Sequence, residues 1–97
     1  MKKFKVFVRG NNYLLHEIGK PPRKCGFYTT VFVEAVNAKQ AEALAVELLK
    51  SDSKLNSACE NNISDPPIIK AESIDEIESF DGCKLPRMGL ALFEEAT

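Results

Sequence analysis

Residues 26–35 constrain the fold more than any other part of this 97-residue chain. They read GFYTTVFVEA, and almost all of them are β-branched or aromatic, which is typical of a β-strand. Because side chains alternate along a strand, one face carries Phe27, Thr29, Val31, Val33 and Ala35. The other face carries Tyr28, Thr30, Phe32 and Glu34. Both faces are partly apolar, so we expect this strand at the centre of a sheet or at a dimer contact.

A helix is predicted directly after this strand, over residues 38–50. Asn37 is a favourable N-cap, and Gln40 three residues later completes a capping box. The segment is rich in the strong helix formers Ala, Leu, Glu and Lys. Its apolar stripe, at helical spacing, consists of Ala41, Leu44, Ala45 and Leu48. We expect the helix to fray near residues 51–53, and a further turn through Leu55 stays open.

Three more strands are predicted from shorter patterns. Residues 3–9 alternate with the period of a half-buried strand, followed by a turn or bulge at residues 10–12 and a resumed strand at 13–15. Residues 68–72 form a third strand, while 73–80 fit either its continuation or a short helical turn. Residues 89–93 form the last strand. The segments between them are predicted as Pro-Pro loops at 19–24 and 61–67 and a turn at Asp81 and Gly82.

These elements predict one α+β domain spanning residues 1–97. Its expected architecture is an antiparallel four-stranded sheet in the order β-β-α-β-β, with one main helix packed on one face. The first two strands should pair as a hairpin, and the last two as a second hairpin. One helix leaves the other face of the sheet uncovered. That face carries Phe7, Tyr28 and Phe32, so we expect a protein partner or a homodimer there.

Catalytic and metal-binding patterns are nearly absent from the sequence. The chain has one histidine, His16, and three cysteines, Cys25, Cys59 and Cys83, spaced too widely for the close ligand pairs of a structural zinc site. A catalytic pair of Cys25 with His16 would lack a third, orienting group. The acidic run of Glu72, Asp75, Glu76, Glu78 and Asp81 fits a solvated face better than a metal site or an acid–base pair. We therefore predict no enzymatic activity, no cofactor and no bound metal.

Nucleic acid is the alternative partner, because the N-terminal part of the chain is basic. Residues 1–33 hold seven Lys or Arg and one acid, although the whole chain has a net charge of −1. Basic side chains interleaved with aromatic rings on an open sheet suit single-stranded nucleic acid. The candidate residues are Lys3, Lys5, Phe7, Arg9, Arg23, Lys24 and Tyr28. No RNP-like motif is present, so we favour a protein-interaction module over this alternative.

A cytoplasmic location is expected, with no membrane association. No apolar run approaches the roughly 18 residues that span a bilayer. The basic start, MKKFK, resembles the tip of a signal peptide, but Lys5, Arg9, Asn11 and Asn12 interrupt the apolar stretch that would have to follow.

The strand at residues 26–35, the alanine-rich helix and the turn at Asp65, Pro66 and Pro67 together resemble a group of small uncharacterised bacterial proteins. These share a GFYTT-type strand, an Ala-rich helix and a DPP turn. The resemblance spans most of the chain and implies a bacterial origin. It brings no activity, cofactor or catalytic residue with it.

Overall fold

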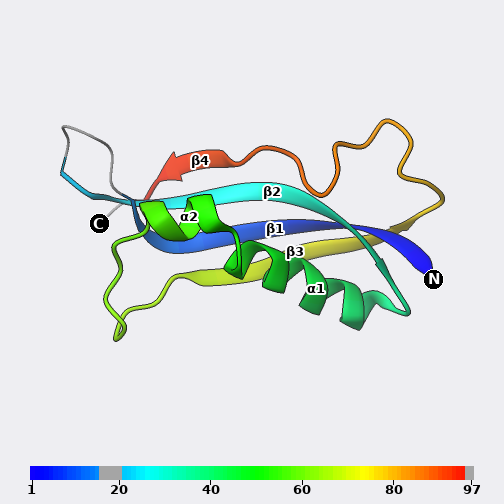
Figure 1. The fold of residues 1–97 in the computed structure, drawn as a ribbon, viewed down its shortest axis with the longest axis horizontal. Coiled ribbons are helices and arrows are strands. Elements are labelled where there is room, and N and C mark those ends of the chain that lie inside the picture. The colour runs from blue at the N-terminus through cyan, green and yellow to red at the C-terminus, as the bar shows by residue number, and fades with distance from the viewer. Residues whose placement is uncertain (16–20, 96–97) are drawn as a thin grey trace.

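β1 (Lys2–Leu15) and β2 (Arg23–Ala35) form a long antiparallel hairpin at the centre of the sheet (Figure 1). The computed structural model describes residues 1–15 and 21–95. The remaining elements are α1 (Ala38–Lys50), α2 (Ser53–Ala58), β3 (Ile68–Ile77) and β4 (Ala91–Glu94). The α+β class, the four-stranded antiparallel sheet and the first hairpin are thereby confirmed.

The strand order is β3-β1-β2-β4, so β2 is an internal strand, as residues 26–35 predict. The predicted second hairpin is wrong, because β3 pairs with β1 and β4 pairs with β2, at opposite edges. The helices carry the chain from β2 past β1 to the far edge, and the loop after β3 carries it back.

The boundaries of β2 and β4 differ from the prediction. β2 begins at Arg23, so the loop expected over 19–24 is wrong at Arg23 and Lys24, while its residues 19 and 20 lie outside the described part of the chain. β4 begins two residues later than expected. Just before it, the chain already follows the edge of β2, since Phe32 N donates to Pro86 O and Met88 N donates to Thr30 O, both at 2.9 Å.

The bulge predicted in the first strand is present. The register of β1 against β2 shifts between Gly10 and Tyr13, and Asn12 has a left-handed φ of 61°, which Asn tolerates better than most residues. Asn61 connects the loop before β3 to this bulge through two hydrogen bonds. Its Nδ2 donates to Asn12 O at 2.7 Å, and its Oδ1 accepts from Leu14 N at 2.8 Å.

α1 begins as predicted. Asn37 Oδ1 accepts from Gln40 N at 2.9 Å, and Gln40 Oε1 accepts from Val36 N, one residue before the N-cap, at 2.7 Å. The buried stripe agrees with the prediction at Ala41 and Ala45, but its third member is Leu49. Leu44, expected to pack on the sheet, is 43% exposed, and Leu48 is half-buried. The helix is rotated so that an i, i+4, i+8 ridge faces the sheet, which turns Leu44 towards the flank.

A second helix, α2, follows α1, so the order is β-β-α-α-β-β. Ser51 ends α1, and the Asp52 side chain caps the new helix by accepting from Leu55 N at 3.0 Å. Leu55 anchors α2 in the core. From the sequence, residues 73–80 fit either a continuation of the strand or a short helical turn. The structure shows a strand as far as Ile77, where β3 ends.

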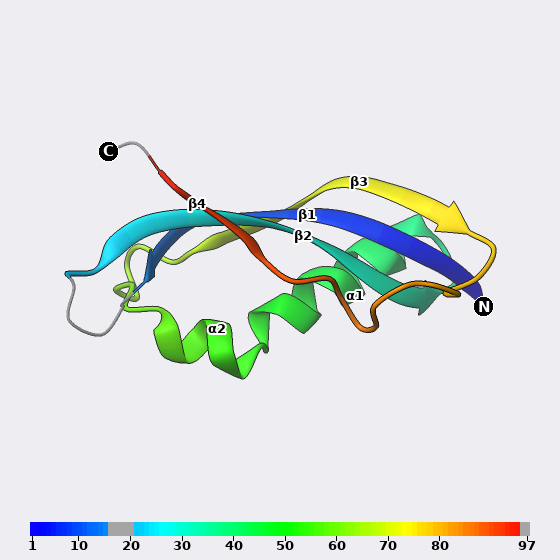
Figure 2. The ribbon, with the colours of Figure 1, turned by 90° about the horizontal axis from the view of Figure 1, so that it is seen from above.

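Both helices lie on the same side of the sheet (Figure 2). The core is formed between them and the helix-facing side chains of β1 and β2, chiefly Phe4, Val6, Val8, Phe27 and Val31. No helix in the described residues is both long and apolar enough to cross a membrane.

Candidate functional site

The side of the sheet that faces away from both helices, here called the open face, holds most of the aromatic side chains. Of the eight Phe and Tyr residues, three are buried in the core: Phe4, Tyr13 and Phe27. Strand alternation and ring contacts place the other five on the open face, namely Phe7, Tyr28, Phe32, Phe80 and Phe93. None of these five is buried, and Phe7 is 38% exposed.

Phe7, Arg9, Tyr28 and Phe93 form an aromatic row across β1, β2 and β4. The Phe7 and Tyr28 rings are parallel within 2°, with their centroids 5.3 Å apart. The Arg9 guanidinium carbon lies 5.5 Å from the Tyr28 centroid and 5.4 Å from that of Phe93. Arg9 Nε is buried without a hydrogen-bond partner among the described residues. Arg9 is therefore held by ring contacts of the cation–π type.

Gly26 makes room for this row. A Cβ atom at Gly26 would lie 2.3 Å from the Phe93 ring and 2.8 Å from Gly10 O. Phe93 thus reaches Tyr28 by crossing the bare backbone of β2, with the two ring centroids 5.3 Å apart.

A second aromatic contact lies towards the other end of the open face. Phe80, from the loop after β3, meets Phe32 edge-on at 6.2 Å, and Lys3 Nζ lies 5.9 Å from the Phe80 centroid. A shallow hollow of about 220 Å³ opens beside the Phe7 end of the aromatic row. It is lined by Lys5, Phe7, Thr30, Ser73 and Asp75.

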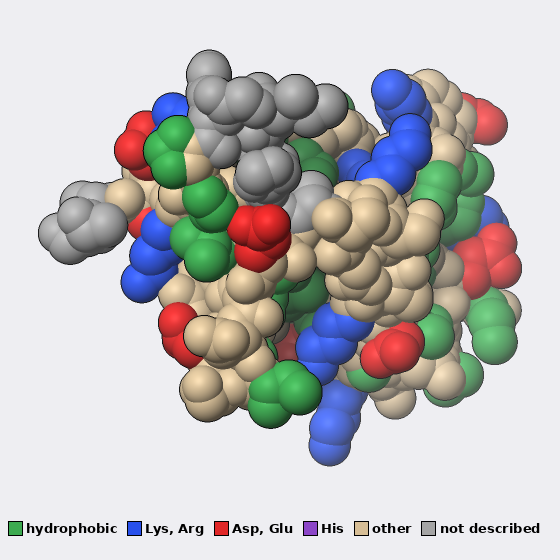
Figure 3. Space-filling view, turned by 60° about the vertical axis from the view of Figure 1, so that its left-hand side comes forward, with side chains coloured by type: hydrophobic (Ala, Val, Ile, Leu, Met, Phe, Trp, Pro, Cys, Tyr) green, Lys and Arg blue, Asp and Glu red, His purple; other side chains and the backbone are tan. Residues whose placement is uncertain are grey.

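Charges of both signs occupy the open face. Strand register puts Lys3 opposite Glu34 and Lys5 opposite Asp75. Glu95 accepts from Asn12 N at 2.7 Å and Asn11 Nδ2 at 3.1 Å, and these bonds, with the nearby charges of Lys24 and Arg9, lower the pKa of its carboxyl. The open face is therefore mixed rather than uniformly basic. At the hairpin end of the molecule, which Figure 3 brings forward, basic and acidic side chains are interspersed as well.

The structure places six of the seven predicted nucleic-acid candidates on the open face: Lys3, Lys5, Phe7, Arg9, Lys24 and Tyr28. Two candidates extend the basic surface less than expected, because Arg23 forms an ion pair with Glu94 at 3.4 Å and Lys24 lies near the acidic Glu95. The sequence analysis missed Phe80, Phe93 and Lys70. Alternation within β4 could have suggested Phe93, but no local pattern marks Phe80.

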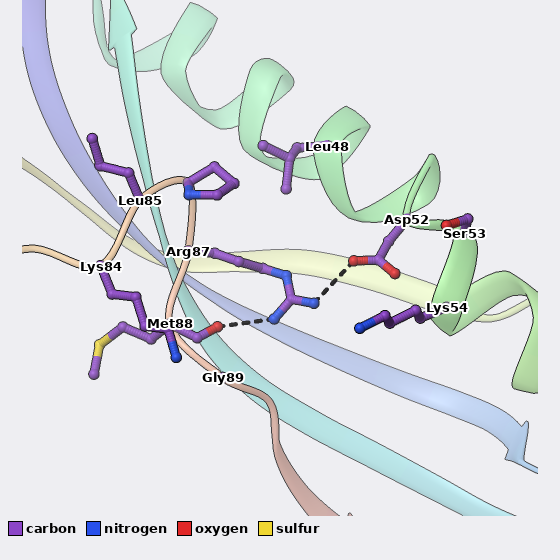
Figure 4. A pocket seen from close by; sticks show the side chains of 10 residues that line it. Leu48, Asp52, Ser53, Lys54, Lys84, Leu85, Arg87, Met88 and Gly89 are labelled. Atoms are coloured by element: carbon purple, nitrogen blue, oxygen red, sulfur yellow. Dashed lines mark hydrogen bonds and ion pairs between the residues drawn. The ribbon is translucent and has the colours of Figure 1, made fainter.

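A separate cleft of about 530 Å³ lies between the junction of the two helices and the loop before β4 (Figure 4). Arg87 Nη2 and Asp52 Oδ2 are 2.9 Å apart, and both side chains are at most 20% exposed. The pKa of the Asp52 carboxyl is lowered, first by the Leu55 N–H and then by Arg87. Asp52 therefore caps α2 and, through its ion pair with Arg87, holds the loop before β4 against the helices.

The cysteines and the acidic run are spread over the molecule. Cys25, Cys59 and Cys83 are half-buried. Asp75 lies on the open face, whereas Glu76 points to the helix side and pairs with Lys2 at 3.7 Å. Among residues 1–15 and 21–95, no group of three or more His, Cys, Asp or Glu side chains could hold a metal ion. His16, which both a zinc site and a catalytic Cys–His pair would require, lies outside the described residues.

No protein-family model, curated protein or solved structure matches this chain.

Proposed function

We propose that this chain is a non-catalytic interaction module that binds a partner protein through the open face. The observation that carries this proposal is the placement of five of the eight aromatic side chains on the sheet face that neither α1 nor α2 covers. Aromatic residues and Arg are enriched at the centres of protein interfaces, where their burial supplies much of the affinity. The aromatic row around Arg9 has this composition.

The size of the open face suits a modest interface. A span of ten strand residues at about 3.3 Å each, across four strands about 4.8 Å apart, gives a planar area of roughly 600 Å². Stable complexes bury about 800 Å² per partner. We therefore expect a partner of moderate affinity, bound and released reversibly, in the same cytoplasmic compartment.

Single-stranded nucleic acid is the second candidate, favoured by five cations on the open face: Lys3, Lys5, Arg9, Lys24 and Lys70. Two features favour protein instead. The Tyr28 ring already contacts Phe7, Arg9 and Phe93, which leaves less of its face for a base. Glu34, Asp75 and Glu95 offset three of the five cations, and this weakens attraction to phosphates.

Affinity capture from the native host, followed by mass spectrometry, tests the proposal with two matched variants. Phe7→Glu places a charge in the aromatic row, whereas Ile63→Glu makes the same kind of change at a fully exposed loop position. We expect one host protein to be captured by the wild type and by Ile63→Glu but not by Phe7→Glu. Titration of that protein should then shift NMR signals of the open face.

Capture that is identical for all three proteins would contradict the proposal. A labelled single strand is the parallel probe. If it binds at low salt, weakens steeply as salt rises, and is lost in Lys3→Ala/Lys5→Ala, the nucleic-acid alternative replaces protein binding.

A further inference from the structure

β3 lies at one edge of the sheet with β1 as its only neighbouring strand among the described residues. No hydrogen bond joins its backbone to a described residue outside β1. The free edge runs from Ile68 to Ile77, and such an edge is a template for pairing with another chain.

A bulge changes the alternation of side chains along β3. Phe7 pairs with Ser73 and Val8 with Ala71, so Glu72 is an extra residue between them. On the open face lie residues 68, 70, 73, 75 and 77. On the helix face lie residues 69, 71, 74 and 76.

This shift makes β3 self-complementary about a point between Glu72 and Ser73. A two-fold axis there, perpendicular to the sheet, pairs each residue with one on the same face of a second copy. Without the bulge, the same axis would pair residues that point to opposite faces. The resulting cross-strand pairs are Ile68 with Ile77, Ile69 with Glu76, Lys70 with Asp75, and Ala71 with Ile74.

The charges agree with this pairing. Within the chain, Lys70 lies opposite Arg9 on β1, a like-charge pair that is unfavourable. In the dimer, Asp75 of the second copy would lie beside Lys70 of the first, on the side of β3 that faces away from β1. The two-fold symmetry would form the same pair a second time, between Asp75 of the first copy and Lys70 of the second. Ile68, which is 50% exposed, would be covered by the other copy's Ile77.

We infer that two copies of this chain pair antiparallel along β3 to form a symmetric dimer with one continuous eight-stranded sheet. Both pairs of helices then lie on one side, and the two open faces form one surface on the other. This inference does not depend on the proposed function, because the backbone of β3 can pair with a second copy whether or not a partner binds the open face, although Lys70 and Asp75 lie at the border of that face.

Charge reversal at the paired positions tests the dimer. In a Lys70→Asp homodimer, two Asp residues face each other at each pair, and in an Asp75→Lys homodimer two Lys residues do. We expect each variant alone to raise the dimer dissociation constant about tenfold or more. An equal mixture of the two restores both opposite-charge pairs, so a heterodimer should form with an affinity near that of the wild type.

Sedimentation velocity over a concentration series up to about 1 mM measures these constants. Circular dichroism confirms that each variant is folded. Lys84→Asp is the matched control, because Lys84 lies in the loop beside the opposite edge, and it should leave the constant unchanged. Phe93→Glu, on β4 at the opposite edge of the open face, should also leave it unchanged, which separates this dimer from binding at the open face.

A lysine and a bulge can also protect an edge strand from pairing. A wild-type protein that stays monomeric throughout the series would overturn the inference in favour of this protective role. A mixture of the two variants that dissociates as readily as each variant alone would overturn it as well.

Discussion

Gly10 lies where β1 passes directly against the ring of Phe27. A Cβ atom at this position would be 2.1 Å from Phe27 Cε2 and 2.5 Å from Cζ, and Phe27 is fully buried in the core. Gly10→Ala should therefore lower the free energy of unfolding by about 1–3 kcal/mol. In a domain of this size, each kcal/mol lowers the Tm by about 4–8 °C. Urea and thermal unfolding followed by circular dichroism measure both effects.

Gly89→Ala is the matched control for this prediction. A Cβ atom at Gly89 would meet no heavy atom within 4 Å, so the change should stay within about 0.5 kcal/mol. Equal losses at the two glycines would show that close packing at Phe27 is not what requires Gly10.

At the scale of elements, α1 offers a direct test of which stripe faces the sheet. Leu49 is fully buried, whereas Leu44 is 43% exposed. Leu49→Ala should cost about 2–4 kcal/mol, because it leaves a cavity beneath the sheet. Leu44→Ala should cost less than about 1 kcal/mol. Urea unfolding of both variants measures these losses, and the reverse ranking would support the stripe predicted from the sequence.

Elements with a strong internal pattern could be predicted from the sequence. The alternation in β1 and β2 and the cap at Asn37 depend on residues close together in the chain, so their positions were correct within a few residues. α2 could not be found in this way. It has six residues, and its anchor is the single side chain of Leu55, which is too little for a helical period.

The candidate site was predictable only where it depends on one strand. Alternation places Lys3, Lys5, Phe7 and Arg9 on one face without any knowledge of neighbouring strands. The position of Arg9 opposite Tyr28 depends on register, and that of Phe93 on the pairing of β4 with β2. Both follow from long-range packing, such as the approach of Phe93 over Gly26, which no local pattern encodes.

At the scale of the whole molecule, the ion pair of Asp52 with Arg87 links the helices to the loop that crosses back to β4. The pKa of Asp52 is lowered in the folded state. The unfolded chain therefore binds this proton more readily, and the stabilisation present above the ordinary carboxyl pKa of about 4 is lost as pH falls. Asp52→Asn keeps an oxygen to cap α2 but loses the charge.

We expect Asp52→Asn to be less stable than wild type by about 1 kcal/mol near neutral pH. The difference should shrink towards zero between about pH 5 and pH 2, because the wild-type carboxyl becomes neutral as well. Urea unfolding at a series of pH values measures it. A difference that stays constant over this range would mean that the charge of Asp52 does not contribute.

Tyr13 should limit stability at the alkaline end. Burial raises its pKa to about 12, with smaller contributions from Cys59 and Asp52, and its side chain packs against Phe27. An unfolded tyrosine ionises near pH 10. Because the folded-state pKa is the higher one, the stabilisation is complete below about pH 10 and is lost as pH rises through 12. Two pKa units correspond to about 2.7 kcal/mol.

Tyr13→Phe removes this ionisation while it keeps the ring. The free energy of unfolding of the wild type should therefore fall relative to that of Tyr13→Phe by about 2 kcal/mol between pH 9 and pH 12. All other titrating groups are common to both proteins, so the difference between their urea unfolding curves isolates Tyr13. Two curves that remain parallel across this range would show that the Tyr13 hydroxyl ionises as readily in the folded protein as in the unfolded chain.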